Sequence, residues 1–246
     1  MMCDGFLSGL SKPDLVVYSD TMSEPHFVDS YVLDVTAYVW DKYKVQVVTV
    51  SKGSLKEDMI TSFEDGSRVA SLPLFMSNGG MIRRQCTNEY KIDPINKYIR
   101  SELDIGRKTK DSIASVNRMF GISLDEIERC KVSQDWWAVN KYPLVDHRIY
   151  RHEVIDYVNN NHPDIANPPR SSCYFCPFHS NDYWSAMKKK HPEMFEDACK
   201  MDDVIRVNKK LEHECFLHRS LIPLRDISFD NPQMEIFGEC EGYCGI

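Results

Sequence analysis

Two apolar segments on either side of a helical segment are the feature of this sequence that most constrains its fold. Residues 14–20 and 45–50 are rich in valine and end in polar residues, which is typical of buried strands. Residues 23–25 end in a proline, which favours a helix from there to about Trp40. A strand, a helix and a second apolar strand predict a parallel α/β unit, in which functional groups collect where the strands end.

Polar residues follow both predicted strands. Asp20 and Thr21 come at the end of the first strand, and Ser51 comes at the end of the second. Because the carboxyl ends of parallel strands meet at one edge of a sheet, we expect these three residues to lie together.

A second set of polar residues follows a strand predicted within residues 112–120. Gly121 allows a ligand to approach the backbone closely, and Ser123, Asp125 and Glu126 offer polar groups. Ser123 with Glu126 also fits a capping box at the start of a helix. A turn followed by a capped helix is therefore the structural alternative to a ligand site here.

The remaining pattern predicts a mixed α/β chain with a helical C-terminal part. Further helices are predicted over residues 54–63, 94–103, 150–160, 182–190 and 192–211. No internal repeat and no Gly/Ser-rich linker divides the sequence. We expect a nucleotide-binding α/β domain at residues 1–165 and a cysteine-bearing helical extension, packed on the same core, at residues 166–246.

Charge and hydropathy exclude several classes of protein. The net charge is −7, which argues against coating nucleic acid by bulk charge, although a local basic patch that contacts RNA stays open. No apolar run reaches the length of a membrane span, and the first residues lack the pattern of a secretory signal. A cytoplasmic location is expected. The nine cysteines are then read as reduced thiols, ligands or catalysts in preference to structural disulfides.

Cysteines are the side chains with the clearest chemistry in this sequence. Cys173 and Cys176 form a Cys-x-x-Cys pair, which suits a metal ion, an iron–sulfur cluster or a redox disulfide. Together with Cys86 they would supply three soft ligands to a metal or cluster, and a metal-free redox pair is the alternative. Cys240 or Cys244 would supply a fourth ligand or a separate redox thiol.

Cationic side chains flank both cysteine segments. Arg83, Arg84 and Lys91 surround the first segment, and Arg170 precedes the Cys-x-x-Cys pair. An arginine side chain binds two phosphate oxygens at once, whereas lysine acts as a point charge. The pattern predicts a pocket for phosphate or sulfate beside the cysteines, and a solvated surface cluster is the alternative.

The order of these segments resembles the phosphoadenosine phosphosulfate (PAPS) reductase-like family, within the PP-loop superfamily of adenine nucleotide alpha-hydrolases. The resemblance covers roughly residues 13–246. It is carried by Val16-Val-Tyr-Ser-Asp-Thr21 with Glu24, Cys86-Thr-Asn-Glu-Tyr-Lys91 with Pro94-Ile95, Gly121-Ile-Ser-Leu-Asp-Glu126 with Arg129, Tyr142-Pro-Leu-Val-Asp146, Arg170 with Cys173 and Cys176, and Glu239-Cys-Glu-Gly-Tyr-Cys-Gly-Ile246.

This resemblance implies a parallel-sheet PP-loop fold and assigns roles to the residues above. The nucleotide site would be lined by Asp20, Thr21, Gly121, Ser123, Glu126 and Arg129. Phosphate or sulfate would be bound by Arg83, Arg84, Lys91 and Arg170. A [4Fe–4S] cluster, with zinc as the alternative metal, would be held by Cys86, Cys173 and Cys176. The mobile nucleophile would be Cys240 or Cys244.

Two departures from the family pattern shape the expected function. The Ser-Gly-Gly-x-Asp-Ser phosphate loop of the superfamily is absent, so the domain is expected to lack its first strand and this loop. Either the chain begins late, or it no longer uses that pocket in the usual way. Where cluster-bearing sulfonucleotide reductases have a cysteine pair there is only Cys86, an arrangement similar to PP-loop tRNA thiolation enzymes.

The implied function is that of an enzyme acting on an adenine nucleotide in sulfur chemistry. It would reduce a sulfonucleotide, or use ATP to adenylate a substrate and then transfer sulfur. Its partners would be the nucleotide and either a thiol electron donor or a tRNA or nucleobase acceptor, and a homo-oligomer is left open. One alternative is an inactive nucleotide-binding or interaction module stabilised by zinc at the same cysteines. Another is a ligase-like or phosphatase-like PP-loop enzyme that makes AMP without sulfur.

Overall fold

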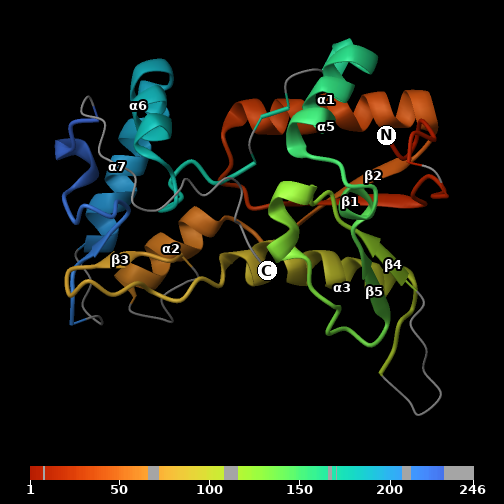
Figure 1. Ribbon diagram of the computed structural model, residues 1–246. Helices are drawn as coiled ribbons and strands as arrows, with labels where there is room; N and C mark the ends of the chain where they lie inside the picture. Colours follow the sequence, from red (N-terminus) through yellow and green to blue (C-terminus); the bar gives the residue numbers. More distant parts are fainter. Residues whose placement is uncertain are drawn as a thin grey trace.

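A computed structural model describes residues 1–7, 9–65, 72–107, 116–165, 168–169, 171–206 and 212–229. These residues form a mixed α/β arrangement with short parallel strand pairs and several helices (Figure 1). None of the helices in those ranges combines the length and the apolar character needed to cross a membrane.

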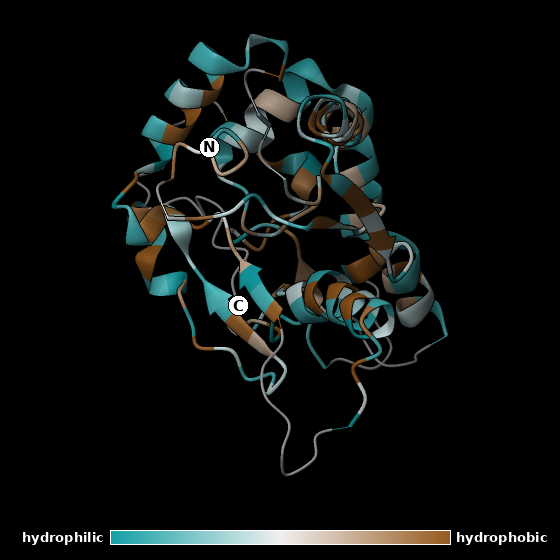
Figure 2. Ribbon diagram, turned by 90° about the vertical axis from the view of Figure 1, so that its right-hand side faces the viewer, coloured by the Kyte–Doolittle hydropathy of each residue, from teal (hydrophilic) through white to brown (hydrophobic). Residues whose placement is uncertain are grey.

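The predicted strand–helix–strand unit is present. β1 (Leu15–Asp20) and β2 (Gln46–Ser51) pair in parallel, and α1 (His26–Tyr43) connects them. Apolar residues, valine among them, occupy the interior of both strands. Figure 2 shows hydrophobic (brown) and hydrophilic (teal) residues along the same helices. The register places Asp20 opposite Ser51, whose hydroxyl donates a hydrogen bond to the Asp20 carbonyl over 2.8 Å. The polar strand ends therefore lie at one edge, as expected.

A second parallel pair consists of β4 (Val116–Met119) and β5 (Ala138–Lys141). β4 falls within the strand predicted at residues 112–120. β5 was not predicted, because four residues of mixed polarity carry no strand signal of their own. Its position is fixed instead by Arg118 of β4, which donates a 3.1 Å hydrogen bond to Asn140. The two-residue strands β3 (Phe75–Met76) and β6 (Cys215–Phe216) pair antiparallel.

The predicted helices are all present, with boundaries shifted by a few residues. They are α2 (Leu55–Glu64), α3 (Asp93–Glu102), α5 (Arg151–Asn161), α6 (Asn181–Lys190) and α7 (Pro192–Arg206). Residues 207–211 of the predicted last helix lie outside the described ranges. Short helical turns are found at η1 (Asn88–Ile92), η2 (Leu124–Arg129), α4 (Pro143–Asp146), η3 (Pro163–Ile165) and η4 (Leu224–Asp226).

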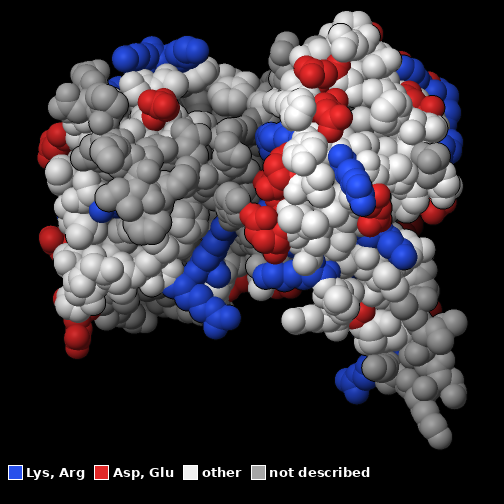
Figure 3. Space-filling view, in the orientation of Figure 1, with Lys and Arg blue, Asp and Glu red and all other residues white. Residues whose placement is uncertain are grey.

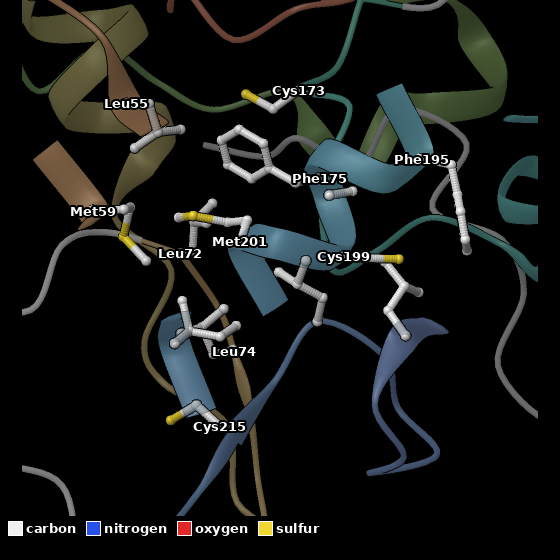
Figure 4. Close-up of a cluster of buried hydrophobic side chains, with 14 of the residues drawn as sticks. Leu55, Met59, Leu72, Leu74, Cys173, Phe175, Phe195, Cys199, Met201 and Cys215 are labelled. Atoms are coloured by element: carbon white, nitrogen blue, oxygen red, sulfur yellow. The ribbon is translucent and has the colours of Figure 1, made fainter. Parts of the chain in front are cut away.

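The main hydrophobic cluster unites segments that are far apart in the sequence. Leu55 and Met59 of α2 pack there with Phe175 of the Cys-x-x-Cys turn and with Met201 of α7 (Figure 4). In Figure 1, α2, β3, α6 and α7 accordingly lie on one side of the molecule. The predicted domain boundary after residue 165 stays a prediction. The cluster joins α2, which precedes that boundary, to α6 and α7, which follow it.

His218 lies beside this cluster as a buried, neutral imidazole. The side chain is 2% exposed, its Nε2 is 2.8 Å from Asn181 Oδ1, and its Nδ1 accepts a 3.1 Å hydrogen bond from the Ser220 amide. The amide oxygen only accepts, so Nε2 carries the proton. Burial lowers the pKa of His218 to about 4, with a smaller contribution from the charge of Arg219.

His218 should make the protein less stable in mild acid. The folded-state pKa lies below the unfolded value of about 6.5, so the stabilisation is present above pH 6.5 and is lost as the pH falls toward 4. We expect a loss of about 2.5 kcal/mol in the free energy of unfolding between pH 7 and pH 4.5 from this residue. Urea titrations should show a correspondingly flatter pH dependence for His218→Gln. His152→Gln, on an exposed surface, should keep the wild-type slope, and equal slopes for all three proteins would contradict the prediction.

Candidate functional site

The carboxyl end of β1 holds the Cys-x-x-Cys turn. Thr21 is buried, and its Oγ1 is 3.4 Å from the sulfur of Cys173. Two residues further on, the Ser23 carbonyl accepts a 3.1 Å hydrogen bond from the amide of Tyr174. Thr21 and Cys173 were both predicted as site residues, and the structure brings them into direct contact across 152 positions of sequence.

A closed ring of hydrogen bonds fixes this turn between α2 and α7. Tyr174 donates its hydroxyl to Asp197 of α7, and the same carboxylate pairs with the Lys56 ammonium of α2 at 2.5 Å. The Lys56 amide donates to the Ser23 hydroxyl over 3.2 Å. The Ser23 carbonyl accepts the hydrogen bond from the Tyr174 amide, which closes the ring. The four residues therefore link the strand end, both helices and the cysteine turn.

Glu24 is a buried carboxylate at the same place. Its side chain is 0% exposed. One oxygen pairs with the Lys91 ammonium at 3.1 Å, and the other accepts from the hydroxyls of Tyr18 at 2.9 Å and Ser171 at 2.7 Å. A buried charge needs an opposite charge and hydrogen bonds to offset its lost hydration. Glu24 therefore determines where Lys91, a predicted anion-binding residue, is held.

Sequence reasoning did not assign Glu24 to the site. A glutamate just before a helix is usually explained by the favourable interaction of negative charge with the helix N-terminus. That reading places the side chain in solvent and gives no indication of burial. The pairing with Lys91 depends on η1, which no sequence pattern indicated.

η1 brings Lys91 to the strand edge. It is a π-helical turn directly before α3, and such turns are frequent at functional sites. The Ser19 hydroxyl of β1 donates to the Tyr90 carbonyl over 2.6 Å and so fastens η1 to the strand. The predicted cysteine–lysine segment thus lies beside the predicted strand end.

Cys86 precedes η1, packs against the hydrophobic cluster that contains Cys173, and contributes weakly to a raised pKa of the Cys173 thiol. Burial is the largest cause of that rise, which takes the pKa of Cys173 to about 12 although Lys91 and the hydrogen bond with Thr21 oppose it. Without a metal, Cys173 is therefore a neutral thiol near neutral pH.

Cys176 completes the turn on its more accessible side. It is half-buried, and its amide donates to the Cys173 carbonyl over 3.0 Å. The same carbonyl is 2.8 Å from Nε2 of His179, whose ring stacks on Tyr183 with centroids 3.7 Å apart. A carbonyl only accepts, so His179 donates this proton and packs in the turn. Within the described ranges, no three His, Cys, Asp or Glu side chains are grouped so that they hold a metal ion.

Two predicted arginines precede Cys86 and differ in their surroundings. The Arg84 guanidinium lies 5.3 Å from the ring centroid of Phe178, which places it beside the Cys-x-x-Cys segment as the sequence indicated. Arg83 is exposed. In Figure 3, a groove separates the two halves of the visible face, with Lys and Arg side chains on its left wall and both acidic and basic side chains on its right wall.

The predicted residues after β4 form a separate hydrogen-bonded group. Ser123 donates to Asp125 over 2.9 Å, and Asp125 accepts a 2.7 Å bond from the Arg151 amide at the start of α5. Glu126 is buried and pairs with Arg129 at 2.8 Å. Ser123 stands at the N-cap position of η2, as the structural alternative expected, but its side chain makes no capping hydrogen bond, so the capping box itself is not formed. Gly121, next to this group, is exposed.

Three predicted site residues, Arg170, Cys240 and Cys244, lie outside the described residues. The geometry above therefore concerns the strand edge, η1 and the cysteine turn. No family model, no curated protein and no solved structure matches this chain.

Proposed function

We propose that this chain is a PP-loop-like enzyme of the PAPS reductase type that acts on an adenine nucleotide in sulfur chemistry. The reaction is sulfonucleotide reduction, or ATP-dependent adenylation followed by sulfur transfer. The observation that carries the proposal is the contact of Cys173 with Thr21 at the carboxyl edge of a parallel strand pair, with Cys86 packed against the hydrophobic cluster that contains Cys173. Ligands of open α/β sheets bind at such edges.

The proposed nucleotide site combines the strand edge with the nearby cations. Asp20 and Thr21 would contact the nucleotide, and Lys91 and Arg84 would bind its phosphate or sulfate. Support comes from Lys91, which reaches the edge through its 3.1 Å pair with Glu24. Gly121, Ser123, Glu126, Arg129, Arg83 and Arg170 remain proposed members of the same site, and Cys240 or Cys244 remains the proposed nucleophile.

The proposed cofactor is a [4Fe–4S] cluster held by Cys86, Cys173 and Cys176. Thiolates are the usual donors to such clusters, so the chemistry of the three side chains fits the group. Cys86 packs against the hydrophobic cluster that contains Cys173, and Lys91 near Cys173 would favour its thiolate. When bound, a cluster with three protein ligands would supply one open iron able to hold sulfide or a substrate sulfur. The second substrate would be a thiol electron donor or a tRNA or nucleobase acceptor.

Anaerobic reconstitution with iron and sulfide tests this proposal directly. The wild type should become brown and retain iron and acid-labile sulfide after desalting, whereas Cys173→Ser should bind neither. Cys130→Ser is the control, because Cys130 is a free thiol outside the cysteine turn, half-buried at the end of η2. A colourless wild type would remove the cluster, and equal loss in Cys130→Ser would show that the cysteine turn is not its site.

A zinc-stabilised binding module is the second candidate, and the ion pairs around the site favour it. Lys52, Lys56 and Lys91 pair with carboxylates at 3.1, 2.5 and 3.1 Å, so these charges are already offset within the protein. A phosphate would have to compete with those carboxylates. Metal analysis separates the candidates: about one zinc per chain without labile sulfide would favour the module.

A further inference from the structure

A second group of titratable side chains lies away from the cysteine turn, between the N-terminal segment, α1 and the end of α5. It consists of Asp4, Tyr38 and Lys42, and of His162, which follows α5. His162 Nε2 is 2.9 Å from an Asp4 carboxylate oxygen, and Nδ1 is 2.9 Å from the Tyr38 hydroxyl. The Lys42 ammonium donates to the same Tyr38 oxygen over 3.0 Å.

The direction of each hydrogen bond follows from the chemistry of the partners. The Asp4 carboxylate only accepts, so Nε2 of His162 carries the ring proton and Nδ1 presents its lone pair to Tyr38. The Lys42 ammonium only donates, so Tyr38 receives from Lys42 and gives its own proton to Nδ1. The resulting network runs from Lys42 through Tyr38 and His162 to Asp4, and the Lys42 ammonium also lies 3.3 Å from Nδ1 of His162.

The charges that would form on proton transfer lie between Asp4 and Lys42, and the Lys42 ammonium is 3.0 Å from the Tyr38 oxygen and 3.3 Å from Nδ1 of His162. If Tyr38 passes its proton to His162, the Asp4 carboxylate lies against the imidazolium and the Lys42 ammonium lies against the phenolate. Burial opposes ionisation of Asp4, but hydrogen bonds from Tyr43 and Tyr157 hold the pKa of this carboxyl below its ordinary value. A carboxylate, an imidazole and a hydroxyl in this order form the arrangement by which a hydroxyl is activated as a nucleophile.

Burial differs along the hydrogen-bonded network: the base is shielded from water, and the nucleophile is nearer to solvent. The His162 side chain is 6% exposed, so the base is shielded from water. Tyr38 is half-buried and Lys42 is exposed, so these two residues are nearer to solvent than His162. A reagent approaching from solvent would therefore meet Tyr38 and Lys42 first.

We propose that Tyr38 is an activated nucleophile that accepts an acyl group from an activated carboxylic ester, with His162 as general base. The phenol oxygen forms a bond to the carbonyl carbon while the ester bond to the leaving alcohol or phenol breaks. The Tyr38 proton moves to His162 and then to the departing oxygen, so the products are the tyrosyl ester and the free alcohol. Lys42 is placed to stabilise negative charge on the phenol oxygen. This site is independent of the cysteine chemistry proposed above.

Acetylation by p-nitrophenyl acetate tests the assignment, with the modified residues identified and timed by peptide mass spectrometry. Tyr98, a half-buried tyrosine on α3, serves as the comparator within the same molecule. General-base assistance contributes at least about 100-fold in rate, so Tyr38 should be acetylated roughly 100-fold faster than Tyr98. Equal rates at the two tyrosines would overturn the proposal.

Two variants separate activation from a merely structural role. His162→Gln removes the base and should bring the Tyr38 rate down to that of Tyr98. Because His162 is buried, this variant requires a check of its far-UV circular dichroism and its unfolding midpoint. Lys42→Met changes an exposed side chain and leaves the base in place, and it should slow acetylation of Tyr38 about tenfold or more. If neither variant changes the rate in folded protein, the network only fastens the N-terminal segment to α1, and the proposal is wrong.

Discussion

Asp202→Ala is expected to lower the free energy of unfolding by about 3–5 kcal/mol. Asp202 of α7 is 1% exposed and accepts hydrogen bonds from the amides of Leu217 at 2.8 Å and Leu224 at 2.9 Å. It also pairs with Arg206. Alanine would leave two buried amides and a partly buried guanidinium without this acceptor, and unsatisfied buried groups are costly. Urea unfolding followed by circular dichroism measures the change.

Asp203→Ala is the matched control for this prediction. Asp203 is the next residue of α7 and pairs with Arg206 at 3.1 Å and with Arg225 at 2.7 Å, but its side chain is 44% exposed. Ion pairs at such exposure contribute about 0–1 kcal/mol. A similar loss in both variants would show that the hydrogen bonds of Asp202 to the 217–224 segment are not what stabilises the fold.

Phe175→Ala, as a separate single variant, is expected to lower the free energy of unfolding by about 3–5 kcal/mol, because the side chain is removed from a packed interior. Phe175 is 0% exposed and lies between the two cysteines of the turn, in contact with the hydrophobic cluster (Figure 4). The same substitution should reduce metal or cluster retention after reconstitution, since the turn loses its main apolar anchor.

Phe178→Ala is the control from the same turn. This ring is half-buried and lies under the Arg84 guanidinium, a contact worth about 0.5–1 kcal/mol at an accessible site. Unfolding in urea should therefore separate the two phenylalanines by about 2 kcal/mol or more. Equal losses would contradict the assignment of Phe175 as the anchor.

The strand–helix–strand unit was predictable because its signals are local. Valine-rich segments with polar ends indicated β1 and β2, and the proline at residue 25 indicated the start of α1. The meeting of Asp20 with Ser51 followed from parallel pairing alone. β5 lacked such a signal, because its place depends on contacts from Arg118 on another strand.

The sequence indicated which residues belong to the candidate site better than it indicated the contacts among them. Charge and cysteine spacing indicated that Cys86, Lys91 and Cys173 belong together. In the structure Cys173 contacts Thr21, Lys91 pairs with Glu24, and Cys86 packs against the hydrophobic cluster that contains Cys173. Glu24 was not assigned because its burial arises from the fold and not from its neighbours in sequence. The partnership with Lys91 depends on a π-helical turn, and residue periodicity does not distinguish such a turn from an α-helix.

The closed ring formed by Ser23, Lys56, Asp197 and Tyr174 has a consequence for how the cysteine turn tolerates sequence change. When one hydrogen bond of a closed ring breaks, the remaining bonds still connect all of its residues. Residue 174 is therefore held to the strand end through its amide and to α7 through its side-chain hydroxyl. Because the amide bond to Ser23 joins two backbone groups, a substitution that removes the Tyr174 hydroxyl or the Asp197 carboxylate should leave the turn attached to the strand end.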